Sequence, residues 1–125
     1  MNNISNRETA AAIFQAALAS VDPYRLVQKH IPAVLDAYRR DNCQRLMLAA
    51  FGKAAFAMAR ALTENPAGEM ITRGIVITKY GHVPGTLPDP IAVYEAGHPL
   101  PDAAGVAATR RLMAMLENPD PRTLL

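Results

Sequence analysis

Apolar residues recur at helical spacing in the first part of the chain. They fall every three or four positions, at Ala10, Ile13, Phe14, Ala17, Leu18 and Val21. Ser5 followed by Glu8 has the spacing of a capping box, in which the two side chains close the first turn of a helix. The pattern predicts an amphipathic helix over residues 6–20.

A second helix is predicted to begin directly afterwards, at Asp22-Pro23. Asp is favoured as the residue that caps a helix, and Pro is favoured at the first helical position. We expect this helix to be short and to end near Lys29, because a residue before proline, here Ile31 before Pro32, avoids the α region. Segment 33–42 is rich in alanine and then charged, and it fits either a helix or a loop.

Three uninterrupted apolar runs are typical of strands that are covered on both faces. They span residues 45–51, 74–78 and 91–95, and residues 123–125 resemble the start of a fourth strand. Continuous apolar runs, rather than alternating ones, favour a parallel sheet. The β-branched residues of the second run also disfavour a helix there.

Helical and loop patterns separate these runs. From Lys53 onward an apolar stripe predicts a helix that fades near 65–68, and Asp102 is placed to cap another helix that runs to Glu117. Segment 80–90 is rich in Gly and Pro, which predicts a loop. Strands that alternate with helices predict an α/β fold, namely a three-layer α/β/α sandwich with a mainly parallel, Rossmann-like sheet.

Composition narrows the class of protein. Half of the 125 residues are hydrophobic, 19% are charged and the formal net charge is +2, which is typical of one globular domain over 1–125. Because no basic run is interleaved with aromatic residues, we expect no nucleic-acid partner. No stretch has the length of a membrane span or the apolar core of a signal peptide, so we expect a cytoplasmic protein with no membrane partner. The single cysteine, Cys43, cannot form an internal disulfide, which fits a reducing compartment.

The turn after the first predicted strand is a candidate site. In a parallel sheet, ligands bind beyond the carboxyl ends of the strands. Gly52-Lys53 lies at such an end, where the start of a helix offers free N–H groups and a partial positive charge, and Lys53 adds a full charge. The turn therefore resembles a phosphate site. It has one glycine rather than a longer glycine-rich motif, so an exposed lysine without a function is the alternative.

The loop after the third predicted strand is a second candidate. Glu95, His98 and Asp102 lie within eight residues there, Gly97 lets the backbone approach a ligand, and two prolines stiffen the loop. Asp102 also suits the cap of the following helix. Glu95 and His98 fit ligand contacts, and the alternative for Glu95 is a hydrogen bond to loop amides.

The remaining histidines do not predict a metal site. Neither His30 nor His82 has a partner at metal-ligand spacing, and the sequence contains no cluster of Cys and His. We expect His30 on the surface of a helix. His82 lies in a glycine-flanked loop, where a functional role stays open.

Three motifs resemble the N-terminal region of one enzyme family. They are Ala50-Phe-Gly-Lys-Ala-Ala-Phe-Ala-Met-Ala59, Gly74-Ile-Val-Ile-Thr-Lys-Tyr-Gly-His82 and Tyr94-Glu-Ala-Gly-His-Pro-Leu-Pro-Asp102. In this order and at these separations they resemble the MOFRL-type glycerate 2-kinases, which carry a DUF4147-like domain and are also met under the name hydroxypyruvate reductase. The resemblance extends from the first helix to the last residue.

This resemblance implies phosphorylation of D-glycerate to 2-phosphoglycerate with ATP and Mg²⁺. It places the family's active-site lysine on Lys53, and it suggests Gly52, Glu95 and His98 as residues that bind the substrate or a phosphate. Phosphoryl transfer depends mainly on positioning and charge neutralisation, for which a lysine at the start of a helix is suited. No Gly-x-Gly-x-x-Gly follows a predicted strand, so an NAD(P)H-dependent hydroxypyruvate reductase has no support in the residues. A non-catalytic α/β binding module is the other alternative.

The family's chains continue beyond the residues present here, through a glycine-rich loop to the MOFRL domain. We therefore interpret residues 1–125 as the N-terminal part of the kinase's α/β domain. We expect this part to fold but to be inactive alone, because the glycine-rich loop is missing. Apolar surface that the remainder would cover should promote self-association.

Overall fold

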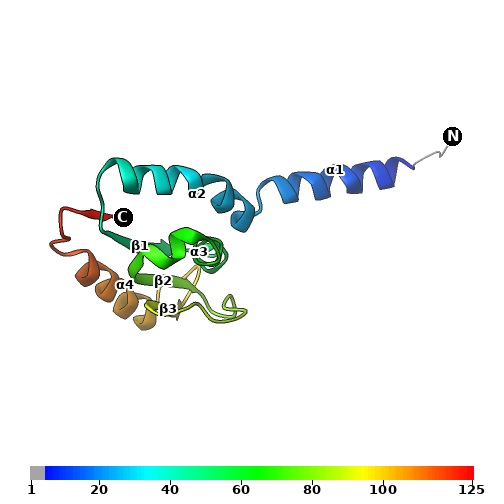
Figure 1. Cartoon of the computed structure of the whole chain (residues 1–125). Helices are drawn as coiled ribbons and strands as arrows, with labels where there is room; N and C mark the ends of the chain where they lie inside the picture. Colours follow the sequence, from blue (N-terminus) through cyan, green and yellow to red (C-terminus); the bar gives the residue numbers. More distant parts are fainter. Residues whose placement is uncertain (1–4) are drawn as a thin grey trace.

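The computed structural model describes residues 5–125 as four α-helices, one 3-10 helix and four strands (Figure 1). The helices are α1 (Asn6–Ser20), α2 (Pro23–Arg40), α3 (Ala55–Thr63), η1 (Pro66–Met70) and α4 (Ala103–Leu116). The strands are β1 (Arg45–Phe51), β2 (Ile71–Lys79), β3 (Ile91–Ala96) and β4 (Thr123–Leu124). The strands lie where the continuous apolar runs predict them, and β2 begins three residues earlier than expected.

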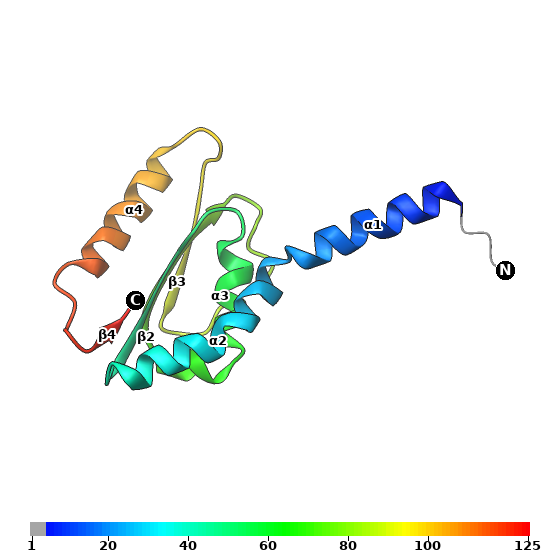
Figure 2. The same ribbon diagram turned by 90° about the horizontal axis from the view of Figure 1, so that it is seen from above.

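All four strands are parallel and form one sheet in the order β3-β2-β1-β4. Helices α2 and α3 lie on one face of the sheet and α4 lies on the other (Figure 2). The predicted α/β fold with helices on both faces of a parallel sheet is therefore confirmed. Because the strands run in one direction, the carboxyl ends of β1, β2 and β3 meet at the same edge.

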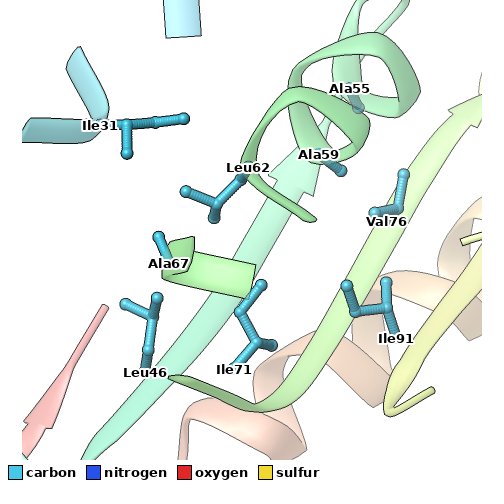
Figure 3. Close-up of a cluster of buried hydrophobic side chains, with 9 residues drawn as sticks. All are labelled: Ile31, Leu46, Ala55, Ala59, Leu62, Ala67, Ile71, Val76 and Ile91. Atoms are coloured by element: carbon cyan, nitrogen blue, oxygen red, sulfur yellow. The ribbon is translucent and has the colours of Figure 1, made fainter. Parts of the chain in front are cut away.

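Two hydrophobic clusters, one on each face of the sheet, hold these layers together. The larger cluster joins the sheet to α2 and α3, and Figure 3 shows Ala59 of α3 beside Val76 of β2. The smaller one joins Ile75 of β2 to Leu112 and Met115 of α4. Adjacent residues of β2 thus belong to opposite clusters, as expected when successive side chains of a strand point to opposite faces.

Helix α1 has the predicted bounds but projects away from the sheet (Figure 1). The capping box is present: the Glu8 backbone N–H donates to Ser5 Oγ at 3.3 Å, and the Ser5 N–H donates to Glu8 Oε2 at 2.7 Å. None of its residues, all within the described part of the chain, is buried, and its apolar positions such as Phe14 are exposed. Among residues 5–125, the apolar positions of α1 are thus left without a buried contact.

The prediction that the second helix ends near Lys29 is wrong. Helix α2 continues for 18 residues to Arg40 with Pro32 inside it, so segment 33–42 is mostly helical. A proline inside a helix removes one backbone hydrogen bond and disfavours the helical conformation of the preceding residue. Here Ile31 is buried in the larger cluster, and Val34, Leu35 and Tyr38 pack against it. Burial of this apolar face offsets the local cost of the proline.

No helix within residues 5–125 combines the length and the apolar character that crossing a membrane requires.

Candidate anion site at the strand ends

A small hollow of about 100 Å³ lies where the carboxyl ends of β1, β2 and β3 meet. Its lining residues come from these three strand ends and the turns that follow them: Gly52, Lys53, Ile77, Thr78, Lys79, Ala96, Gly97 and His98. Gly52, Lys53 and His98, which the sequence identifies as candidates, are therefore brought together from two separate motifs. Their role in binding stays a prediction.

Gly52 shapes the turn between β1 and α3. Its φ angle is +110°, a conformation that L side chains rarely adopt. Its N–H donates to the carbonyl of Ile77 at 3.0 Å, and its own carbonyl accepts the N–H of Ala55 at 3.1 Å. This turn ends the strand and begins the helix within three residues, which leaves Lys53 at the rim of the hollow.

Lys53 lies in this turn, before α3, and not in the helix that the sequence predicts to open with it. The N-cap residue is Ala54, and no side chain of the described residues caps the helix. The first N–H groups of a helix lack partners inside it and carry partial positive charge. The exposed ammonium of Lys53 therefore stands next to a helix start that no side chain closes.

Thr78 is a lining residue that the sequence analysis missed. Only 2% of its surface is exposed, and within residues 5–125 its Oγ1 atom has no hydrogen-bond partner. Buried hydroxyls are usually satisfied, so this one is exceptional. A hydroxyl residue at the end of an otherwise apolar strand, next in the sheet to Gly52-Lys53, is the sequence signal that could have identified it.

The loop from 97 to 102 fits tightly against itself. A Cβ atom at Gly97 would lie 2.6 Å from the carbonyl oxygen of Leu100, so a larger residue would force the loop to move. Asp102 caps α4, because Asp102 Oδ1 accepts the N–H of Gly105 at 2.8 Å. The Tyr80 hydroxyl donates to Asp102 Oδ2 at 2.8 Å. The predicted N-cap role of Asp102 is therefore confirmed, and Asp102 also joins the loops that follow β2 and β3.

These hydrogen bonds hold the pKa of Asp102 below its ordinary value, the largest cause being the Gly105 N–H, followed by Gly97 N–H and the Tyr80 hydroxyl. We expect Asp102→Ala to lower the melting temperature by a few degrees, because the cap of α4 is lost, and Asp102→Asn, which can still cap, to lower it less.

A lowered pKa in the folded state stabilises the fold at pH values above the ordinary pKa of an aspartate. That contribution is lost as the pH falls through the lowered pKa of Asp102. Melting curves of wild type and Asp102→Asn between about pH 5 and pH 2 should therefore converge toward the acid end. A constant difference across this range would show that Asp102 does not titrate as described.

Glu95 lies at the same sheet edge but does not line the hollow. Its Oε1 atom accepts the N–H of Gly81 at 2.7 Å, which is the loop-amide alternative considered from the sequence. Gly81 has a positive φ of 74°, so this bond anchors a tight turn at the start of the 80–90 loop. His82 is exposed with its Nδ1 3.3 Å from the Tyr80 carbonyl oxygen, and His30 is exposed on α2.

A wider hollow of about 500 Å³ adjoins the small one on the α4 side of the strand ends. The two share Ile77, Ala96, Gly97 and His98, and the wider hollow adds Thr109 and Arg110 of α4. Among the described residues, no Asp or Glu lines either hollow. With Lys53, Lys79 and Arg110 as the charged lining residues, the strand ends have the chemistry of a site for an anion.

Comparison with known proteins places these features in a family. Residues 9–125 match the family described as "Domain of unknown function (DUF4147)". A D-glycerate 2-kinase from Thermotoga maritima is 37% identical over 113 residues, which cover 90% of this chain and 25% of that protein. A protein from Agrobacterium vitis named "Putative hydroxypyruvate reductase" is 34% identical over 125 residues, covering 99% of this chain and 26% of that protein.

The fold agrees with these sequence matches. A crystal structure of a glycerate kinase from Thermotoga maritima superposes with a TM-score of 0.74 at 37% identity, over 89% of this chain and 25% of that chain. The chain thus spans about a quarter of the length of the relatives it matches. It belongs to the DUF4147 family, as its resemblance to the MOFRL-type glycerate kinases predicts.

Proposed function

We propose that this chain forms part of the active site of a glycerate 2-kinase, which phosphorylates D-glycerate to 2-phosphoglycerate with ATP. The observation that carries the proposal is the hollow at the strand ends, which none of the carboxylates in residues 5–125 lines and where Lys53 stands beside a start of α3 that no described side chain caps. Both substrates of this reaction are anions, and the group that is transferred is anionic as well. Preorganised positive charge at that position is what phosphoryl transfer requires.

The size of the hollow suggests which part of a substrate it takes. The hollow of about 100 Å³ is small beside the adjoining one of about 500 Å³, so we assign to it a small charged group of the substrate, a carboxylate or a phosphoryl group. Lys53 would neutralise the charge of this group. The N–H of Ala55 already donates to the Gly52 carbonyl, so the next N–H groups of α3 would orient it. His98, on the wall shared with the wider hollow, would contact the part of the ligand that extends beyond.

The support for ATP and Mg²⁺ is the resemblance to the kinase family, and not a metal site among the described residues. Within residues 5–125 no group of three or more His, Cys, Asp or Glu side chains is placed to hold a metal ion. Mg²⁺ in kinases is bound by one or two carboxylates together with substrate phosphates.

A hydroxypyruvate reductase is the second candidate, because the Agrobacterium vitis relative carries that name. Such an enzyme needs a nicotinamide site, whose glycine fingerprint follows a strand and opens a helix. After β1 the chain has the single Gly52, and neither β2 nor β3 is followed by the fingerprint. The residues at the strand ends therefore favour the kinase.

One experiment separates the two candidates. The complete gene product that contains this chain would be assayed in parallel for ATP consumption with D-glycerate, with L-glycerate and with hydroxypyruvate, and for NAD(P)H oxidation with hydroxypyruvate. We expect ATP consumption that depends on D-glycerate. NAD(P)H oxidation without any glycerate-dependent ATP consumption would instead establish the reductase.

We further propose that residues 1–125 are the N-terminal part of the enzyme's α/β domain. Two apolar grooves support this proposal, one of about 510 Å³ between α2, α3 and β1, and one of about 380 Å³ between α2, β1 and β4. Phe51 and Met58 line the first groove and are exposed. Grooves lined by exposed apolar side chains offer surface that the remainder of the domain would cover.

The 125-residue chain alone should therefore be folded but catalytically silent. Phosphoryl transfer needs the nucleotide, the metal ion and the acceptor held together, whereas the hollow proposed here would hold a single anionic group. We expect a cooperative melting curve, a tendency to self-associate in sedimentation experiments, and no glycerate-dependent ATP consumption. Turnover by the isolated chain that Lys53→Ala abolishes would show that the active site is complete within it.

A further inference from the structure

We propose that the Thr78 hydroxyl is a further ligand contact of the strand-end hollow, where it donates a hydrogen bond to an oxygen of a bound oxyanion. The oxyanion is the carboxylate of the acceptor or a phosphoryl group. This inference rests on the proposed function for the identity of the ligand. It adds a neutral donor to the cationic groups already described.

The burial of this hydroxyl is the first argument. Thr78 is 2% exposed, and its Oγ1 atom has no partner among residues 5–125. An unpaired hydroxyl in an apolar environment lowers the stability of the fold, and valine has nearly the same shape and a high preference for strands. A threonine at this position therefore costs stability unless a ligand accepts its hydrogen bond.

The position of Thr78 in β2 is the second argument. Alternation along the strand places Thr78 on the same face as Val76, which packs with Ala55 and Ala59 of α3 in the larger cluster. Thr78 is two residues closer to the carboxyl end of β2 than Val76, and it lines the hollow together with Gly52 and Lys53. The neighbouring Ile77 is paired with Phe51 and accepts the Gly52 N–H. Thr78 is thus held beside the turn that carries Lys53.

The surroundings of Thr78 indicate the class of ligand. The hollow it lines contains the lysines Lys53 and Lys79 and no carboxylate among the described residues. Free N–H groups at a helix start and a lysine both favour an anion. A threonine hydroxyl in the same hollow can provide the directed hydrogen bond that fixes one oxygen of such an anion.

The test compares Thr78→Val, which removes the hydroxyl, with Thr78→Ser, which keeps it. Binding of inorganic phosphate and of D-glycerate to the complete gene product would be measured separately by calorimetry, so that no turnover is needed. Thr72→Val is the matched control, because Thr72 lies on the same strand but outside the hollow. Melting curves of all variants accompany the titrations.

We expect Thr78→Val to weaken binding of one of the two ligands about tenfold or more, the loss typical of a hydrogen bond to a charged group. Thr78→Ser and Thr72→Val should bind like the wild type. Thr78→Val should melt no lower than the wild type, since it removes an unpaired buried hydroxyl. A loss confined to phosphate identifies the phosphoryl group, and a loss confined to D-glycerate identifies the carboxylate.

Three results would overturn the inference: unchanged affinity of Thr78→Val for both ligands, equal loss in Thr78→Ser and Thr78→Val, or a wild-type protein that binds neither ligand. A failure of the proposed kinase function gives a different result from a failure of the inference about Thr78. In that case the protein shows no glycerate-dependent ATP consumption, while anion binding still depends on the hydroxyl of Thr78.

Discussion

Replacing Lys53 by alanine in the complete enzyme should lower kcat/KM for glycerate phosphorylation by a factor of about 10² to 10³. This is the effect of removing one preorganised group that stabilises charge in a transition state. The melting temperature should hardly change, because Lys53 is exposed and belongs to neither hydrophobic cluster. Steady-state kinetics beside a thermal melt measure both effects.

Lys29→Ala is the matched control for this prediction. Lys29 is also exposed, but it lies on α2, away from the residues that line the hollow. Its loss should leave kcat/KM near the wild-type value. Wild-type turnover in Lys53→Ala would mean that Lys53 is an exposed lysine without a catalytic role, the alternative that its sequence context leaves open.

The second large effect is expected for Gly52→Ala. A Cβ atom at Gly52 would meet nothing of the described chain within 4 Å, so the substitution introduces no collision. Its φ of +110° is nonetheless strained for any L side chain, which costs about 1–3 kcal/mol of unfolding free energy. Denaturant unfolding would measure this loss.

Gly85→Ala separates backbone strain from the mere addition of a methyl group. A Cβ atom at Gly85 would also meet no described atom within 4 Å, and its φ lies outside the positive range. This variant should be as stable as the wild type. Equal stability of Gly52→Ala and the wild type would show that the turn before α3 relaxes freely.

Gly52→Ala should also reduce turnover more than its loss of stability explains. Relief of the strain at Gly52 requires a change in the turn, which would move Lys53 relative to the ends of β2 and β3. A misplacement of about 1 Å can cost on the order of 10²-fold in rate. Kinetics measured well below the melting temperature distinguish this effect from partial unfolding.

The strands and the α/β fold could be predicted because their signals are local. Each strand is a continuous apolar run, and parallel sheets with helices on both faces require such runs. The residue that ends α2 could not be predicted, because continuation through Pro32 depends on burial of Ile31 against residues distant in sequence. Tertiary packing decides whether a helix continues through a proline, and the conformational preference of the residue before proline carries no information about that packing.

The candidate site was predictable in part for the same reason. Strand ends identify Gly52, Lys53 and His98, because parallel strands bring their carboxyl ends to one edge. Whether Glu95 faces the hollow or the Gly81 amide depends on the conformation of the 80–90 loop, which has no periodic pattern. Thr78 was missed because a threonine in a β-branched run is ordinary, and only the structure reveals that its hydroxyl has no partner.

The identity of the reaction product tests the proposed glycerate 2-kinase most directly. The complete gene product would be incubated with D-glycerate and ATP, and the product offered to enolase with and without a phosphoglycerate mutase. Enolase acts on 2-phosphoglycerate, so we predict that the wild type yields phosphoenolpyruvate without the mutase. The rate of its formation should fall by a factor of about 10² to 10³ in Lys53→Ala. A product that enolase accepts only after the mutase has acted, or no ATP-dependent product at all, would contradict the proposal.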